Sequence, residues 1–418
     1  MVSRADLDRT PFGRRGLGGW LAADPARPLL VVAAMIAAAV TFVLARSTLL
    51  PGLGYWDTGE AQVVPPVMGT LHPTGFPSYV LLGWLASVVL QPFGEPAFRM
   101  NLFAGLCVGV AAGVTVSLVR ALTRSTILGV AAGLCLAVTP SVWAIGTRAE
   151  AHALHLALLA ILVRLLVGWN VARRASGSGP DADDRGADRW LVVAAVVFGL
   201  AMGNHSLTLL LALPVGLYVL AVHPAILRRP RLILACVAAL GITVVLVFLE
   251  LPLRAGPFRA PLVYGRPETW EGFWYVVLAQ QFQGSLVDPF GDLGGKAALL
   301  ASRTVAQFGV LAGLVPAAFI VTCVVRPRYA LLSGSATLIT VFFAASYENA
   351  DIGRYYLGPI LFAWTWLAVG AAALVSAVVG SPDERAAGRP PGRRESPLRA
   401  VVGVLVAVLL IAPMALAV

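Results

Sequence analysis

A short stretch near the N-terminus holds the residues best suited to chemistry in this chain. It runs Tyr55-Trp56-Asp57-Thr58-Gly59-Glu60 and is followed by Leu71-His72-Pro73-Thr74-Gly75-Phe76-Pro77-Ser78-Tyr79. Asp57 and Glu60 are three residues apart, so a local helix would place both carboxylates on one face. One could then act as a general base and the other as an orienting group or a metal ligand. The alternative is that Asp57 caps a short helix whose first turn holds Glu60.

Further polar residues stand at the ends of apolar runs. Glu150, His152 and His155 have helical spacing, which fits a metal site or, for His155, an interhelical hydrogen bond. Asn204-His205 separates two apolar runs, as a turn at a cavity floor or a simple hairpin cap would. His72 precedes a proline, so its turn is rigid, and it could bind a phosphate, orient a base or merely be solvated.

The elements that must position these residues are membrane helices. With 58% hydrophobic and 12% charged residues and a mean hydropathy of +0.82, the 418-residue chain has too few charges to cover a soluble domain. The net charge of +10 comes mainly from arginines in short clusters between apolar runs. That distribution indicates membrane topology and excludes a nucleic-acid partner. The four cysteines lie in apolar runs without paired spacing, which excludes a zinc site.

Runs of about 20 apolar residues predict eleven transmembrane helices. They are Pro28–Leu49, Met100–Val119, Thr126–Trp143, His152–Trp169, Trp190–Met202, Ser206–Val222, Leu232–Leu251, Thr304–Val325, Tyr329–Ser346, Tyr356–Val379 and Leu398–Val418. The apolar segment Phe76–Phe93 is predicted to lie in the interface. If it crossed instead, the arginine clusters of the following loops would fall outside, against the positive-inside rule.

This topology places the N-terminus in the cytoplasm and gathers the unusual polar residues on the outer side. The predicted parts are a cytoplasmic basic tail (1–27), a transmembrane catalytic domain (28–380) with outer loops 50–99 and 252–295, a flexible cytoplasmic loop (381–397) and a last helix (398–418). Ionisable groups at membrane depth are costly, so their gathering on one face predicts a functional site. Arg254 and Arg354 are positive charges on that side, where their planar forks suit a phosphate or ordinary lipid headgroups.

The motifs resemble those of a known family. Trp56-Asp57-Thr58-Gly59-Glu60 with His72-Pro73-Thr74-Gly75-Phe76-Pro77 is similar to the W-D-x-G-E … H-P-P-G-Y-P signature of the protein O-mannosyltransferase-like GT-C glycosyltransferases. Further matches in the same order are Arg99–Leu102, Pro140–Trp143, Ala149–His155, Gly203–His205 and Leu251–Arg254. Thr74 departs from the signature, and His152 and His155 stand where the family tends to have Tyr and Asn.

The resemblance implies a GT-C-type helical bundle with interfacial helices in the first outer loop. It also implies a multi-pass enzyme of the cell membrane that moves a sugar, mannose-like, from a polyprenyl-phosphate donor to a protein or glycan hydroxyl outside the cytoplasm. Asp57 would activate the acceptor, and Arg254 and Arg354 would hold the lipid phosphate; a divalent metal is possible. The alternatives are a transporter or flippase of lipid-linked intermediates and a non-catalytic envelope assembly protein.

We therefore predict two groups of site residues, with no assigned metal ligand. The predicted catalytic residues are Asp57, Glu60, His72 and Glu150. The predicted substrate-binding residues are Trp56, Tyr79, Asn101, His152, Asn204, His205, Arg254 and Arg354.

Overall fold

The chain is helical throughout the parts that the structure describes. This computed structural model describes residues 27–175, 185–379 and 397–415, and within them it has helices and one isolated β-bridge between Leu286 and Tyr347, with no strand. The prediction of an all-α fold is confirmed. The predicted basic tail 1–27, except Arg27, and the predicted loop 381–397, except Pro397, lie outside the described residues.

Eight helical segments of the described ranges are long and apolar enough to cross a membrane. They are α2 (Arg27–Ser47), α5 (Pro96–Thr123), α8 (Ala151–Ala175), α9 (Arg185–Asn204), α11 with α12 (Pro230–Phe248, Glu250–Ala255), α14 with η6 and α15 (Leu293–Phe308, Gly309–Gly313, Leu314–Val325), α16 (Pro327–Ala345), and η7 with α17 (Ile352–Tyr356, Leu357–Val379). Each corresponds to one of the eleven predicted spans.

The other three predicted spans are helical but shorter or broken. They are α6 with α7 (Thr126–Val138, Pro140–Gly146), η3 with α10 (Ser206–Leu211, Ala212–Val222) and α19 (Pro397–Ala415). Over the predicted span Thr126–Trp143 the helix is broken, and its two parts are bent by 69°. Pro140 has no amide hydrogen to continue the helix, and the Thr139 hydroxyl donates to the Cys135 carbonyl and accepts from the Trp364 indole.

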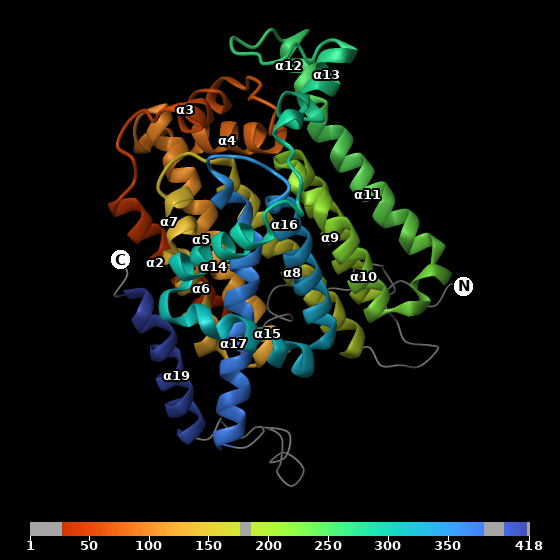
Figure 1. The fold of residues 1–418 in the computed structure, drawn as a ribbon. Helices are drawn as coiled ribbons and strands as arrows, with labels where there is room; N and C mark the ends of the chain where they lie inside the picture. Colours follow the sequence, from red (N-terminus) through yellow and green to blue (C-terminus); the bar gives the residue numbers. More distant parts are fainter. Residues whose placement is uncertain (1–26, 176–184, 380–396, 416–418) are drawn as a thin grey trace, which may run out of the picture.

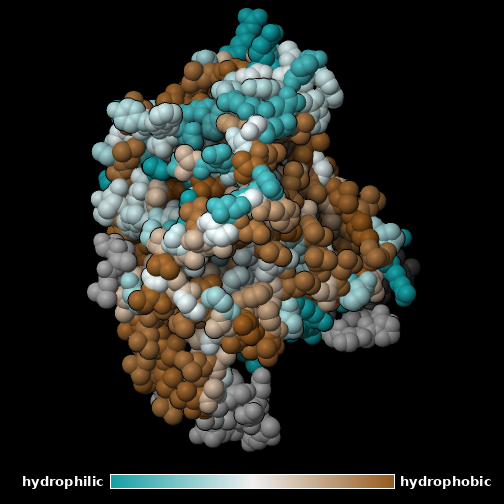
Figure 2. All heavy atoms as spheres, viewed as in Figure 1, coloured by the Kyte–Doolittle hydropathy of each residue, from teal (hydrophilic) through white to brown (hydrophobic). Residues whose placement is uncertain are grey.

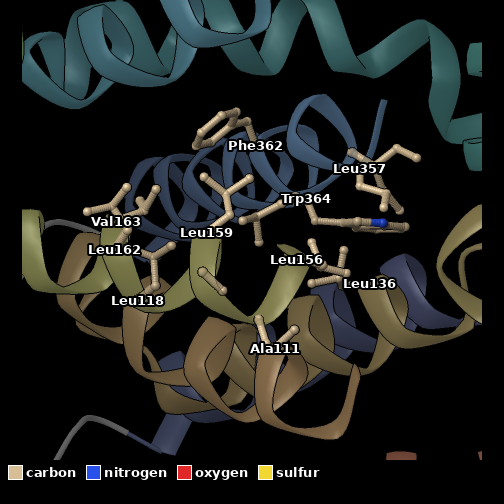
Figure 3. Packing of buried hydrophobic residues seen from close by; sticks show 14 of the residues in the cluster. Ala111, Leu118, Leu136, Leu156, Leu159, Leu162, Val163, Leu357, Phe362 and Trp364 are labelled. Atoms are coloured by element: carbon tan, nitrogen blue, oxygen red, sulfur yellow. The ribbon is translucent and has the colours of Figure 1, made fainter. Parts of the chain in front are cut away.

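The core of the bundle is built around α5, which packs against α2, α6 and α8. Gly109 and Gly113 let α2 come close, since a Cβ at either glycine would stand within 3 Å of an α2 carbonyl oxygen. Side chains of α8 and α17 fill the next layer, where Trp364 lies beside Leu136 and Leu156 (Figure 3). This hydrophobic packing fixes the ends of α5, α8 and α17 relative to one another.

Short helices cover one end of the bundle (Figure 1). They include α3 (Trp56–Val63), η1 (Pro65–Val67), α4 (Pro77–Val89), η2 (Gln91–Phe93), α13 (Trp270–Val277) and η5 (Gln280–Ser285). A further short helix, η4 (Pro224–Arg228), connects α10 to α11. With 13 residues, α4 extends about 20 Å, which is too short to span a bilayer. Hydrophilic side chains gather over this end, while the visible flank below is largely apolar (Figure 2). The predicted short helix within Phe76–Phe93 is thus present.

Candidate active site

A cavity of about 740 Å³ opens at the end of the bundle covered by α3 and α4. Its walls come from five separate segments: the start of α3 with the loop before α4, residues 148–152, residues 205–207, residues 278–286 and residues 343–355. The lining residues that the sequence singled out are Trp56, Asp57, His72, Glu150, His152, His205 and Arg354. Most of the predicted site is therefore brought together, although its members are up to 298 positions apart in the chain.

Asp57 lies in the first turn of α3 with its carboxylate half exposed to the cavity. The capping interpretation is wrong, because the N-cap position is Tyr55 and no side chain caps the helix. The carboxylate instead accepts a hydrogen bond from Arg354, with 2.9 Å between Oδ2 and Nη1. Among the described residues, its other oxygen has no hydrogen-bond partner, so it is available to a substrate.

Arg354 joins the carboxylates of the site. Its Nη1 lies 2.9 Å from Asp57 Oδ2 and 3.2 Å from Glu150 Oε2, while its Nη2 bonds Asp351. Three carboxylates thus share one guanidinium, and little of its charge is left for a phosphate. Arg354 fits a residue that orients Asp57 and Glu150 better than one that holds the lipid phosphate.

Glu150 is buried beside the first turn of α8 and makes two charged contacts. Its Oε1 lies 2.9 Å from His152 Nδ1, and its Oε2 faces Arg354. Burial alone would raise the pKa of Glu150, but the hydrogen bond from His152 and the charge of Arg354 lower it to about 2. Glu150 is therefore a carboxylate at neutral pH and cannot serve as a proton donor.

Glu60 holds His72 from outside the cavity. One carboxylate oxygen accepts from the His72 backbone amide at 2.7 Å, and the other contacts His72 Nδ1. The His72 ring also meets Phe76 and Phe282 edge-on. Burial would lower the pKa of His72, but the hydrogen bond and charge of Glu60, helped by Asp57 and Glu150, raise it above the usual 6.5.

Charge removal at Glu60 tests this pair. Glu60→Gln keeps an acceptor for the His72 amide but removes the negative charge. Because the pKa of His72 is raised, the pair stabilises the fold fully below pH 6.5 and loses this contribution as pH rises through the raised pKa. We expect a thermal midpoint about 2 °C lower than that of the unmodified protein at about pH 6, and a smaller difference at higher pH. The exposed Glu95→Gln is the control, and a difference that grows with pH would contradict the assignment.

Asp57, Glu60 and His72 also have the composition of a metal site. One ligand atom from each lies within 4.8 Å of the others, the one such group among the described residues. Two carboxylates and an imidazole suit a divalent ion. Here, however, Asp57 is bonded to Arg354 and Glu60 to His72, so an ion would have to displace Arg354 and break the direct contact between Glu60 and His72. The metal pattern considered for Glu150, His152 and His155 is not formed.

Asn101 binds neighbouring protein segments and does not line this cavity. Fully buried on α5, it donates from Nδ2 to the Leu50 carbonyl, and its Oδ1 accepts from the Ala149 amide and from Gln62 Nε2. Gln62 in turn bonds Gly54, in the loop before Asp57. Asn101 therefore links the segments that carry Asp57 and Glu150. In this structure it positions the site, where the sequence had predicted substrate binding.

Removal of the Asn101 amide is expected to loosen both segments. Asn101→Ala removes three hydrogen bonds and leaves the buried Ala149 amide without its partner, so it should destabilise the fold by about 3 kcal/mol. It should also lower sugar transfer, although the side chain touches no substrate. Thr115→Val on the same helix is the control, because its hydroxyl bonds only the Ala111 carbonyl within α5. Thermal melts in detergent measure the loss; equal melting of both variants would contradict the linking role.

Three other predicted substrate-binding residues lie outside the cavity. Tyr79 is fully buried and donates to the Ala61 carbonyl. Asn204 is buried and donates to the Ala151 carbonyl. Arg254 donates from Nε and Nη2 to the Met68 and Val67 carbonyls, so its guanidinium tethers α12 to the end of η1.

Arg148 is the cavity residue missing from the predicted site. It lines the cavity two residues before Glu150, its Nε is buried without a hydrogen-bond partner, and it forms no ion pair within the described ranges. Its charge is thus free, unlike that of Arg354. The signal in the sequence was an arginine on the predicted outer side, against the positive-inside rule and two residues from a carboxylate.

Part of this chain is similar in sequence to known proteins. Residues 57–226 match the model of the Protein O-mannosyl-transferase TMEM260 N-terminal domain. Over 270 residues the chain is 30% identical to mouse (Mus musculus) Protein O-mannosyl-transferase TMEM260, which covers 62% of this chain and 34% of the mouse protein. The match thus spans about a third of the length of that relative.

Solved structures share the fold at low identity. ArnT from Cupriavidus metallidurans, bound to undecaprenyl phosphate, has a TM-score of 0.55 at 17% identity, covering 96% of this chain and 72% of that chain. The oligosaccharyltransferase of Archaeoglobus fulgidus in the apo form has a TM-score of 0.54 at 15% identity, covering 93% and 55%. The chain is therefore a multi-pass membrane protein with the GT-C glycosyltransferase fold, and its residues 57–226 are similar to the TMEM260 family of protein O-mannosyl-transferases.

Proposed function

We propose that this protein is a membrane glycosyltransferase that moves a hexose, mannose-like, from a polyprenyl-phosphate donor to a hydroxyl group of a protein or glycan. The observation that carries the proposal is the cavity itself, where the accessible carboxylate of Asp57 and the free cation of Arg148 line one chamber. The mouse relative is named as an O-mannosyl-transferase, and the ArnT neighbour holds undecaprenyl phosphate. The name of the mouse relative supports transfer of mannose, and the ligand of ArnT supports a lipid-linked donor for this chain.

In the proposed reaction, Asp57 is the general base. It takes the proton of the acceptor hydroxyl while the hydroxyl oxygen forms a bond to C1 of the sugar. The bond between C1 and the phosphate oxygen breaks, and its electron pair leaves with the lipid phosphate. Arg148 lies where its charge can stabilise that departing phosphate. Arg354 and Glu150 hold Asp57 in place through the shared guanidinium.

The rim of the cavity suits the acceptor. Tyr55 and Trp56 both line it, and their side chains are 86% and 93% exposed. Exposed aromatic rings bind sugar faces and peptide side chains. We place the acceptor against this rim, next to Asp57, so that the proton acceptor and the attacking hydroxyl are neighbours.

We place the cavity on the extracytoplasmic side of the cell membrane. Several arginines lie at the helix ends remote from it, including Arg120 near the end of α5, Arg174 at the end of α8 and Arg231 at the start of α11. Cytoplasmic loops carry the excess of arginine in membrane proteins. The cavity end would then face outward, and the N-terminus would be cytoplasmic.

A reconstituted assay tests the function. Purified protein in vesicles is given polyprenyl-phospho-mannose labelled in the sugar, together with membrane extract as a source of acceptors. We expect label to enter protein or glycan and bare polyprenyl phosphate to form in equal amount. A donor that crosses the vesicle bilayer with its C1–O bond intact would indicate transport instead. If wild-type protein forms no polyprenyl phosphate from any polyprenyl-phospho-hexose, the proposal is wrong.

A further inference from the structure

One wall of the cavity carries a cluster of rings that the proposed mechanism does not use. His152, His205, Tyr355 and Phe76 all line the cavity. The rings of His152 and His205 are 4.7 Å apart, and Tyr355 lies 5.9 Å from each. Phe76 meets His205 edge-on at 5.4 Å. Four distant segments thus build one aromatic surface that contains no arginine or lysine.

Hydrogen bonds determine which ring nitrogen of His152 and of His205 carries a proton. His152 Nδ1 faces the Glu150 carboxylate at 2.9 Å and must donate to it, so Nε2 is the ring nitrogen left to accept a hydrogen bond. That Nε2 is buried, without a partner in the described parts of the chain. His205 Nδ1 accepts from the Leu207 amide at 3.1 Å, so its proton is on Nε2. Burial also lowers the pKa of His205 well below 6.5, which keeps the ring neutral. The pair offers one acceptor and one donor.

We propose that this ring cluster is the subsite for the sugar ring of the donor, with His152 Nε2 accepting from one sugar hydroxyl and His205 Nε2 donating to another. The inference rests on the proposed function. A sugar presents apolar ring faces, which pack on aromatic side chains, and hydroxyls that both donate and accept. An uncharged wall suits the sugar, and the free charge of Arg148 in the same cavity suits the phosphate.

The burial of His152 supports a ligand role. The residue is only 5% exposed, and a buried nitrogen without a hydrogen bond is destabilising, so such atoms are uncommon unless a ligand or water completes them. His155, one helical turn further on α8, is a matched comparison. It is similarly buried, has an unpartnered Nδ1 and lies 5.8 Å from His205, but it does not line the cavity.

The test compares a lipid with and without its sugar. His152→Asn keeps an amide that can donate to Glu150 but has no atom at the position of Nε2. His205→Asn keeps an acceptor for the Leu207 amide and removes the Nε2 donor. Short-chain polyprenyl-phospho-mannose and the same polyprenyl phosphate without sugar are titrated into protein in nanodiscs. We expect each variant to bind the sugar-bearing lipid about 10-fold more weakly and the bare lipid as tightly as wild type. His155→Asn should bind both lipids as wild type does.

The outcomes separate the subsite from the function. The subsite inference is overturned if wild type does not distinguish the two lipids, or if His152→Asn and His205→Asn change neither affinity or both equally. A variant that no longer binds bare lipid is judged unfolded from its thermal midpoint, and the other variant then decides. If wild-type protein binds neither lipid, the proposed function fails, independently of the subsite.

Discussion

Asp57→Asn should reduce sugar transfer by about 10³-fold while leaving donor binding nearly intact. Asparagine keeps an oxygen that accepts from Arg354 Nη1, so the local geometry survives. It cannot take the proton of an acceptor hydroxyl, so only the chemical step is lost. Release of bare polyprenyl phosphate measures the rate, and titration with polyprenyl phosphate measures binding.

Glu348→Gln is the matched control for that experiment. Glu348 is an exposed acid between two cavity residues, Tyr347 and Asn349, but it does not line the cavity itself. Its removal should leave the rate within about twofold, because a solvated charge outside the cavity contributes little. If Asp57→Asn retains full activity, Asp57 is not the base and the proposed mechanism is wrong.

Arg148→Ala should weaken binding of polyprenyl phosphate by about 30-fold. A hydrogen bond to a charged group contributes about 1.5–3 kcal/mol, which corresponds to about 10- to 150-fold in affinity. Arg148→Lys should recover part of the loss, because it restores the charge but not the planar fork. Titration in nanodiscs at two salt concentrations measures the effect, and the loss should be larger at low salt.

Arg254→Gln distinguishes this assignment from the one that the motif resemblance implied. Arg254 is bonded to the Val67 and Met68 carbonyls and lies outside the cavity, so its removal should lower the thermal midpoint and leave phosphate affinity unchanged. In the reverse pattern, Arg254→Gln would lose affinity for polyprenyl phosphate and Arg148→Ala would keep it. That result would restore Arg254 as the phosphate-binding arginine, as the motif resemblance implied. Either result identifies which arginine faces the phosphate.

The amino-acid sequence by itself determined the class of protein and the order of its helices. Bilayer thickness sets the length of an apolar run, so composition within each window of about 20 residues is sufficient to locate a span. All eleven predicted spans correspond to helical segments, and the short helix within Phe76–Phe93 is present. The motif around Asp57 and His72 indicated the resemblance to the O-mannosyltransferase-like family, because several polar and aromatic residues stand there at the spacing of the family signature.

Only the tertiary structure decided what each polar residue does. Arg354 and Asp57 are 297 positions apart, yet they form an ion pair, so the charge of Arg354 is not available to a phosphate. Arg148 then remains as the cavity arginine without an ion pair among the described residues. Asn101 links Leu50 to Ala149, and Arg254 tethers α12 to the end of η1. The physical reason is that hydropathy acts locally along the chain, whereas a hydrogen bond or ion pair depends on which distant helix ends the packed core brings within about 3 Å.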